Sequence, residues 1–375
     1  MRRGINLFSF CLFPWFVPLI FAPCAYREYS LNRISGAFSP AMRMKVMEAL
    51  QKKIPPDSPL GSFLRMLESG EKIMNVSGLP GSAKAFLFSQ AFAAGRSVVV
   101  ACPTLDEAER LARDLSLFMD PDKVVLYPPW DILSFDILAS QRDTETGRIS
   151  ALCRLALGEK AVYIATTASL LQRAVPESVV RSCIRTVSIG DTLERDGFTG
   201  FLEEAGYGRV PMVEEQGEYS VRGQVIDVFT PAAPNPFRLV LMGDEIESIR
   251  TFDPVSQRSL KELAEFTLTP ARELIRRAET RRRAVRNITM RANDLGLPRS
   301  VREKLIEIVD NGFGGSINPL FMSMFYINEG NGSESIGLSA FSSYVPRDAV
   351  VFFYDSGDIA RSRERIETDV RRAVE

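Results

Sequence analysis

Hydrophobic and polar positions along the chain follow two spacings, one typical of amphipathic helices and one typical of strands. Helical spacing marks residues 43–53, 60–69, 82–94 and 143–157. Short apolar runs predict strands at residues 72–77, 97–102, 124–127 and 161–166, and the run SVVVAC at 97–102 predicts a fully buried strand. Because strands and helices alternate, this part of the chain predicts an α/β fold with a parallel sheet and helices on its faces.

The pattern changes near residue 183. Residues 184–266 contain one helical stretch at 192–205 and otherwise short alternating segments broken by Gly and Pro. This pattern predicts a small α+β insert on an antiparallel sheet. Gly243-Asp244 predicts a tight turn between two strands, and Gly223 is a candidate bulge position.

After Pro270 the chain becomes helical and basic. It closes with AVVFFY at 349–354, which predicts a buried strand, and with a charged helix. We therefore expect an α/β domain interrupted by an insert. The expected boundaries are an apolar leader at 1–41, a first α/β piece at 42–183, the insert at 184–268 and a return piece at 269–375.

The amino-acid composition excludes several catalytic and metal-binding mechanisms. The 375 residues include no histidine, which excludes every Ser-His, Cys-His and His-metal mechanism, and we expect no metal and no cofactor. The five cysteines form no CxxC pair, as is typical of reduced thiols in a cytoplasmic protein. The formal net charge is −1, so any contact with DNA requires a local basic patch.

The amino terminus allows two interpretations. Arg2 and Arg3 precede an uncharged run at 4–26, which is a signal-peptide pattern interrupted by two prolines. Under that interpretation the chain is an exported binding protein, or contacts a membrane through its first 30 residues. The alternative is that translation starts at Met42 or shortly after it, and we favour this alternative because the rest of the chain is typical of an intracellular protein.

One segment resembles a phosphate-binding loop that has lost its chemistry. Residues 78–85 (GLPGSAKA) lie between a predicted strand and a predicted helix, where a GxxxxGK[ST] loop would lie. Gly78, Gly81 and Lys84 are present. Ala83 replaces the second required glycine, and Ala85 replaces the hydroxyl that binds Mg²⁺. We expect no nucleotide hydrolysis by this loop.

Arginines gather on the predicted helix that follows Pro270. Arg276, Arg277, Arg281 and Arg283 are candidate contacts for the phosphates of DNA. The alternative is a solvated helix whose arginines pair with nearby acids, which is the commoner outcome for such a run.

The insert contains a candidate docking surface. With a period of two, Arg238 and Met242 lie on one face of a strand, and Arg222 lies on the strand before it. Two arginines beside an apolar tip suit a protein partner. Ordinary polar positions on an exposed sheet face explain the pattern equally well.

Three segments carry a resemblance to a known family: GYGRVPMVEEQGEYSVRGQVIDVF, FRLVLMGDEIESIRTFDPVSQRS and YPPWDILSFD. They resemble the amino-terminal, UvrB-like portion of the bacterial transcription-repair coupling factors (Mfd), from about residue 42 to the end. The resemblance implies a degenerate P-loop-NTPase-like body in two pieces (domains 1a and 1b) and an inserted UvrA-interaction domain 2. Residues 131–144 leave no room for the long DNA-probing hairpin of UvrB, so the coupling-factor branch fits better.

The resemblance also implies a site and a function. By motif, the UvrA-facing positions are Arg222, Arg238 and Met242, and Met242 departs from the family's aromatic residue. The implied function is a non-catalytic, UvrA-recruiting module of transcription-coupled nucleotide excision repair. The chain stops before the family's polymerase-binding and translocase domains, as a split or truncated relative or a fragment would. The enzymatic alternative is a nucleotide-dependent DNA remodeller that acts through Lys84 with a separately encoded motor.

Overall fold

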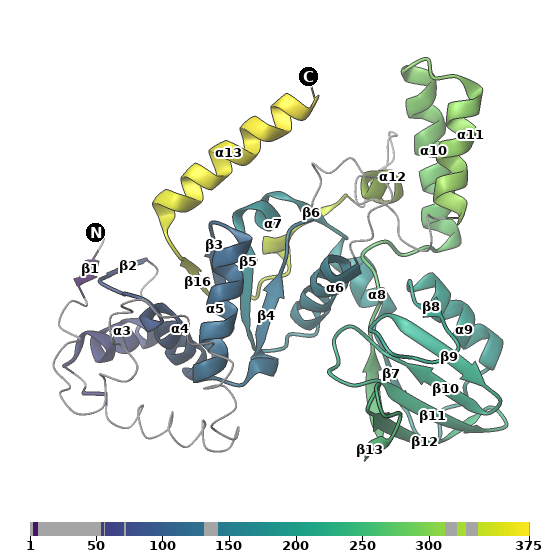
Figure 1. Ribbon diagram of the computed structural model, residues 1–375, viewed down its shortest axis with the longest axis horizontal. Coiled ribbons are helices and arrows are strands. Elements are labelled where there is room, and N and C mark those ends of the chain that lie inside the picture. The colour runs from purple at the N-terminus through teal and green to yellow at the C-terminus, as the bar shows by residue number, and fades with distance from the viewer. Residues whose placement is uncertain are drawn as a thin grey trace. The chain divides into compact units, whose positions relative to one another are not determined.

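The computed structural model describes residues 3–6, 54–55, 57–70, 73–130, 142–311, 321–327 and 337–374. The chain forms two compact units (Figure 1). One comprises Met1–Leu126, Lys160–Ala165 and Pro346–Ile359, and the other comprises Tyr127–Glu159, Thr166–Val345 and Ala360–Glu375. The predicted helix at 43–53, most of the apolar leader and the segment 131–141 lie outside the described residues. Among the helices of the described ranges, none is long and apolar enough to cross a membrane.

The first unit contains a four-stranded sheet with the order β16-β3-β5-β4. Its strands are β3 (Val98–Cys102), β4 (Val124–Tyr127), β5 (Val162–Thr166) and β16 (Val350–Phe353). β3 and β5 occupy the centre, and every residue of both is buried, which the valine run predicted for β3. Three helices share one apolar core with these strands: α3 (Pro59–Glu68), α4 (Ala83–Ala93) and α5 (Leu105–Phe118). The predicted parallel α/β class is confirmed.

The prediction that 349–354 forms a buried strand is wrong in one respect. β16 is an edge strand that pairs in parallel with β3. Phe352 packs into the core, with its ring 4.5 Å from that of Phe88. Val351 and Phe353 point to the other face and are 49% and 65% exposed. An apolar run predicts strand formation, but it does not predict whether both faces are covered.

Two smaller features complete this unit. β1 (Arg3–Asn6) pairs in parallel with β2 (Met74–Ser77), and the sequence pattern did not predict a strand at β1. Thr104 caps the start of α5. Its Oγ1 accepts a hydrogen bond from the backbone N–H of Glu107 at 3.3 Å and donates one to the Glu107 carboxylate at 3.0 Å.

In the second unit, α6 (Arg142–Ala156) is followed by α7 (Thr167–Leu171), β6 (Arg173–Ala174) and α8 (Glu177–Cys183). A buried ion pair joins α6 to the chain that leaves the insert. The side chains of Arg148 and Glu273 are 0% and 1% exposed, and Arg148 Nε donates to Glu273 Oε1. The same guanidinium donates to the Tyr127 hydroxyl and to the Pro128 carbonyl, so its charge is both paired and hydrogen-bonded.

The insert enters and leaves through two paired strands. β7 (Arg185–Ser188) and β14 (Glu265–Leu268) are antiparallel neighbours. Between them the chain builds a six-stranded sheet with the order β13-β12-β11-β10-β9-β8. The strands are β8 (Gly208–Arg209), β9 (Glu218–Arg222), β10 (Val225–Val228), β11 (Phe237–Met242), β12 (Glu245–Phe252) and β13 (Ser259–Leu263). All neighbours are antiparallel except β8 and β9.

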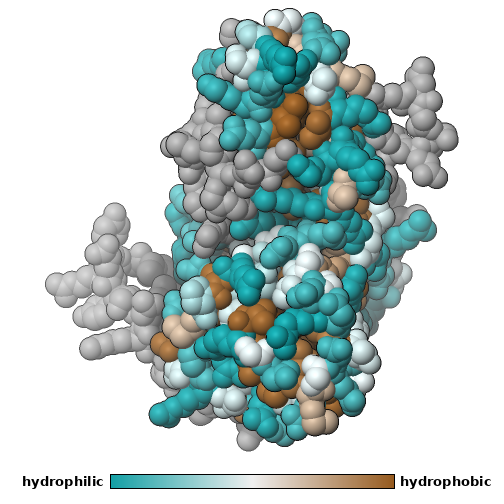
Figure 2. Space-filling view, turned by 90° about the vertical axis from the view of Figure 1, so that its right-hand side faces the viewer, coloured by the Kyte–Doolittle hydropathy of each residue, from teal (hydrophilic) through white to brown (hydrophobic). Residues whose placement is uncertain are grey.

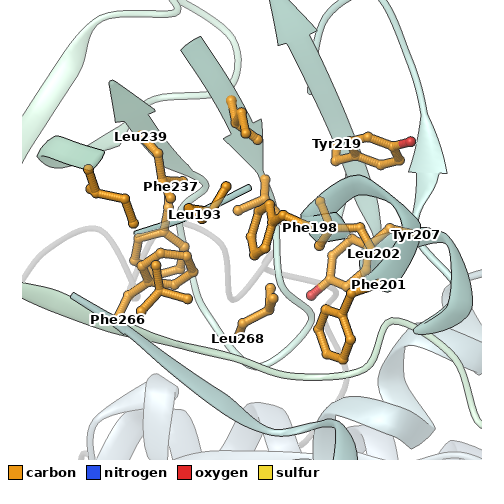
Figure 3. Packing of buried hydrophobic residues seen from close by; sticks show 14 of the residues in the cluster. Leu193, Phe198, Phe201, Leu202, Tyr207, Tyr219, Phe237, Leu239, Phe266 and Leu268 are labelled. Atoms are coloured by element: carbon orange, nitrogen blue, oxygen red, sulfur yellow. The ribbon is translucent and has the colours of Figure 1, made fainter. Parts of the chain in front are cut away.

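One helix, α9 (Arg195–Glu204), covers one face of this sheet. Its apolar positions Phe198, Phe201 and Leu202 recur at helical spacing and point into the core (Figure 3). Alternate strand residues meet them, and the rings of Phe237 and Phe266 stack with their centroids 4.2 Å apart. The opposite face of the sheet is therefore the one left for polar side chains.

The return segment forms a helical hairpin of α10 (Ala278–Asp294) and α11 (Arg299–Asn311). Gly296, with φ of 62°, ends α10 in the left-handed conformation, which glycine adopts without strain. Asn287 Nδ2 fastens α10 to α12 (Met322–Tyr326) by donating to the carbonyls of Met324 and Ile327 at 2.8 and 2.7 Å. β15 (Ser339–Ala340) pairs with β6, and α13 (Ser356–Val374) ends the chain.

Candidate partner-binding site

The sheet of the insert brings the predicted docking residues onto the face opposite α9. Asp227 lies directly across from Arg238 on the neighbouring strand and from Ser220 on the other. Val225 lies across from both Arg222 and Val240. Since cross-strand partners share a face, the two arginines and Met242 lie on one side, as predicted.

The two arginines are bound to one buried carboxylate. Asp227 is 0% exposed and accepts three hydrogen bonds. Arg238 donates from Nε to Oδ1 at 2.7 Å and from its terminal nitrogen to Oδ2 at 2.9 Å, and Arg222 donates to Oδ2 at 2.7 Å. Charge-assisted bonds of this length are among the stronger ones in proteins, so Asp227 fixes the orientation of both guanidinium groups.

Arg238 is held further by its surroundings. Its guanidinium lies 4.3 Å from the centroid of the Phe252 ring, a cation–π contact. It also donates to the side-chain oxygen of Gln257 at 3.2 Å and to the Gln257 carbonyl at 3.4 Å. The hydrogen bonds that Arg238 donates to Asp227 raise the pKa of Arg238 above its ordinary value, so its positive charge is permanent.

Gln257 adopts an unusual backbone conformation to serve this role. Its φ of 58° is in the left-handed region, which costs a non-glycine residue about 1–2 kcal/mol. Its side-chain nitrogen donates to the carbonyls of Val213 and Pro254 at 3.1 and 2.7 Å, which stabilises the loop in this form. The residue was not predicted, because a left-handed glutamine has no sequence signature.

The two hairpin turns at one end of the sheet frame the exposed part of the surface. Gly223 (φ 60°) and Gly243 (φ 66°) each open a two-residue turn, one after Arg222 and one after Met242. The tight turn at Gly243-Asp244 is confirmed. The predicted bulge at Gly223 is wrong, because this glycine is needed for the turn. The register shifts lie instead between Val240 and Leu241 and between Thr251 and Phe252.

Exposure separates the three predicted residues. The side chains of Arg238 and Arg222 are 20% and 49% exposed, and Met242 is 67% exposed. The surface thus consists of a mostly buried, fixed Arg238, a half-exposed Arg222 and an exposed apolar side chain, Met242. The sheet domain occupies the lower half of Figure 2, where apolar surface interrupts the hydrophilic surface. Such a mixture is typical of a protein-binding surface.

The degenerate phosphate loop begins α4 in the first unit. Gly78 and Gly81 adopt φ of 74° and 53°. Lys84 does not extend into an open loop: its Nζ lies 3.7 Å from the centroid of the Tyr354 ring. Ala85 is 0% exposed and belongs to the core, so the position of the missing hydroxyl faces packed side chains.

The four arginines predicted to touch DNA have different surroundings. Arg277 donates to the Ser182 hydroxyl and carbonyl at 3.0 and 3.1 Å, and Arg283 donates to the Phe325 carbonyl at 3.3 Å. Arg276 and Arg281 line a cavity of about 830 Å³ whose wall also carries four glutamates: Glu203, Glu204, Glu303 and Glu307. Burial, and then Arg272, lowers the pKa of Arg276. DNA contact at these four residues stays a prediction, and the acidic wall disfavours a phosphate at Arg276 and Arg281.

Comparison with known proteins adds to this geometry. Residues 186–274, which contain Arg222, Arg238 and Met242, match the family model described as "UvrB interaction domain". The chain carries a UvrB interaction domain. Its sheet of six strands, its covering helix α9 and its exit strand β14 lie within the matched residues, and the entry strand β7 begins one residue before them.

Beyond this domain the chain is similar to proteins named transcription-repair-coupling factor. The Myxococcus xanthus protein is 34% identical over 268 residues, which are 68% of this chain and 22% of that protein. The Bacillus subtilis protein is 30% identical over 259 residues (68% and 22%), and the Escherichia coli protein is 29% identical over 272 residues (72% and 22%). The chain thus spans 22% of the length of these relatives, and the predicted resemblance to their amino-terminal portion is confirmed.

Proposed function

We propose that the UvrB interaction domain of this chain docks UvrA, and that the chain serves transcription-coupled nucleotide excision repair as a recruiting module. The docking surface consists of Arg222, Arg238 and Met242. The single observation that carries the proposal is the fixing of both arginines by the buried Asp227 beside an exposed apolar tip. The resemblance to the coupling factors supports UvrA as the partner.

The geometry suits an acidic partner surface. Arg222 donates to Asp227 from one terminal nitrogen and keeps N–H groups for a second carboxylate, and little rotamer entropy remains to be lost on binding. Met242 supplies the apolar contact in place of an aromatic side chain, with a smaller and more flexible surface. We therefore expect binding that depends more on the arginines than on Met242.

A binding assay with purified UvrA tests the proposal. The full chain is immobilised, and its affinity for UvrA is compared with that of the Arg222→Ala/Arg238→Ala variant. We expect a loss of at least 30-fold, about 2 kcal/mol, as for the removal of central interface arginines. Arg209→Ala is the matched control, because Arg209 is an exposed arginine that pairs with Tyr219 and so lies on the opposite face of the same sheet. Absence of binding by the parent chain, or equal losses in both variants, would refute the proposal.

We also propose that the chain does not hydrolyse nucleotides through residues 78–85. The contact of Lys84 with Tyr354 and the burial of Ala85 support this view, because a working loop needs a free lysine and a Mg²⁺-binding hydroxyl. An ATPase assay with and without DNA decides between this proposal and the enzymatic alternative. We expect the same background rate for the parent chain and Lys84→Ala, and a Lys84-dependent rate would contradict it.

A further inference from the structure

The helical hairpin carries a charged notch that lies apart from the sheet surface. A cavity of about 520 Å³ on α10 is lined by Glu279, Arg282, Arg283 and Arg286. Among the described residues that line the cavity, three cations accompany one carboxylate, a net charge of +2. The whole of α10 contains five arginines, one glutamate and one aspartate, a net charge of +3, although the complete chain has a net charge of −1.

Glu279, the carboxylate among these described lining residues, is already paired. Arg283 donates to Glu279 Oε1 at 2.9 Å, and its side chain is only 10% exposed. The same guanidinium donates to the Phe325 carbonyl at 3.3 Å, so Arg283 is a fixed wall of the notch. Arg282 and Arg286 are exposed and lie one helical turn apart. Residues at this spacing lie side by side on a helix, with about 5–6 Å between their Cβ atoms.

We infer that this notch binds the phosphate backbone of duplex DNA. Two exposed guanidinium groups one turn apart match the repeated charge of a nucleic-acid strand, and arginine is the residue best suited to bidentate phosphate contact. All four side chains that line the notch within the described part of the chain are charged. Contacts of this kind position a protein on DNA without selecting a sequence. Hydrophilic surface predominates over the hairpin in the upper half of Figure 2.

The placement differs from the one that the sequence pattern predicted. Of Arg276, Arg277, Arg281 and Arg283, only Arg283 lines the notch. The inner face of α10 is set by its buried residues, among them Ala284, Asn287 and Ile288. Arg282 and Arg286 lie on the outer face, because a helix places residues four apart together.

The test is fluorescence anisotropy of the full chain with a labelled 30-base-pair duplex of random sequence, over a range of salt concentrations. Each phosphate contact contributes a slope of about −0.9 to a plot of log K against log salt concentration. One contact therefore raises the affinity roughly eightfold when the salt is lowered from about 1 M to about 0.1 M. We expect Arg282→Ala/Arg286→Ala to weaken binding about 60-fold at 0.1 M and to reduce the slope by about 2. Arg282→Lys/Arg286→Lys keeps both charges and should retain the slope.

The control removes two other exposed arginines, Arg299 and Arg363, whose side chains are 81% and 63% exposed and lie outside the notch. Arg299→Ala/Arg363→Ala should leave the slope unchanged. Three results would overturn the inference: no salt-dependent binding by the parent chain, equal losses in the notch and control variants, or displacement of the DNA by polyglutamate at equal charge concentration. Alanine favours helices, so loss of α10 is not expected in the notch variant, and circular dichroism checks it.

Discussion

Replacement of Asp227 by asparagine tests the architecture of the candidate site most directly. The amide keeps the size of the side chain but removes the charge that accepts three hydrogen bonds from Arg222 and Arg238. Leaving one member of a buried ion pair without its partner costs about 3–5 kcal/mol. The cost here is smaller, because Arg222 is half-exposed and Arg238 keeps its contacts with Gln257.

We expect Asp227→Asn to lower the free energy of local opening by about 2–3 kcal/mol, near the value of hydrogen bonds to charged groups. Hydrogen exchange followed by mass spectrometry measures this opening for the amides of β10 and β11, independently of the rest of the chain. At 1.4 kcal/mol per factor of ten, exchange in these strands should become about 30- to 150-fold faster.

Glu262→Gln is the matched control. Glu262 lies opposite Arg250 on the same face of the sheet, and a terminal nitrogen of Arg250 is 3.0 Å from Glu262 Oε1. The side chain of Glu262, however, is 76% exposed. A surface pair is worth about 0–1 kcal/mol, so exchange should rise no more than about fivefold. If both variants exchange alike, burial of Asp227 is not what makes its pairs strong. If Asp227→Asn has its full effect in an Arg238→Gln background, the two residues are not coupled, and the reasoning fails.

Three further predictions concern the body of the protein. Gly206→Ala should destabilise the insert by about 2 kcal/mol or more, because φ is 92° and a Cβ would lie 2.9 Å from the Arg272 side chain; hydrogen exchange of α9 measures it. Arg148→Met should lower the thermal unfolding midpoint by several degrees, since it leaves Glu273 buried and unpaired at a cost of about 3–5 kcal/mol. Burial raises the pKa of Cys102 from 9.0 to about 12, so the native thiol should resist iodoacetamide at pH 8, and its contribution to stability should be lost as pH rises from 9 towards 12.

Each of these predictions has a control in the same chain. Gly190→Ala has nearly the same strained φ, 86°, with nothing within 4 Å of the added Cβ, so a smaller effect there isolates the clash with Arg272. Adding Glu273→Gln to Arg148→Met should restore part of the lost stability, and no recovery would contradict the buried-charge account. The urea-unfolded chain should react with iodoacetamide at Cys102, and equal native labelling would contradict burial of the thiol.

Sequence patterns predicted the element types well wherever one face of an element is buried. The valine run at 97–102 formed the buried strand β3, and the helical spacing at 60–69 formed α3, both as predicted. The pattern failed where burial depends on partners distant in sequence. β16 has an equally apolar sequence, but its place at the sheet edge leaves Val351 and Phe353 exposed.

The sequence pattern identified the two arginines and Met242 of the candidate site, but not the residues that hold the two arginines in place. Period-two alternation was sufficient to place Arg238 and Met242 on one face. Asp227 was missed because a single aspartate in an apolar strand gives no sign of whether it is buried. Its role depends on cross-strand register, which pairs it with Arg238 and brings Arg222 within reach. Gln257 was missed for a similar reason, since its contacts come from a loop that folds back.

The pairing of β7 with β14 determines how easily this domain could be inserted into another protein. The chain enters at Arg185–Ser188 and leaves at Glu265–Leu268 on neighbouring strands, so the two ends of this fold almost meet. A module with adjacent ends can be spliced into a surface loop of an unrelated host without stretching either structure. The conformational cost of closing such a loop grows only slowly with its length, by about 0.6 kcal/mol per doubling. The UvrB interaction domain is therefore a unit that a host protein could gain without altering its own core.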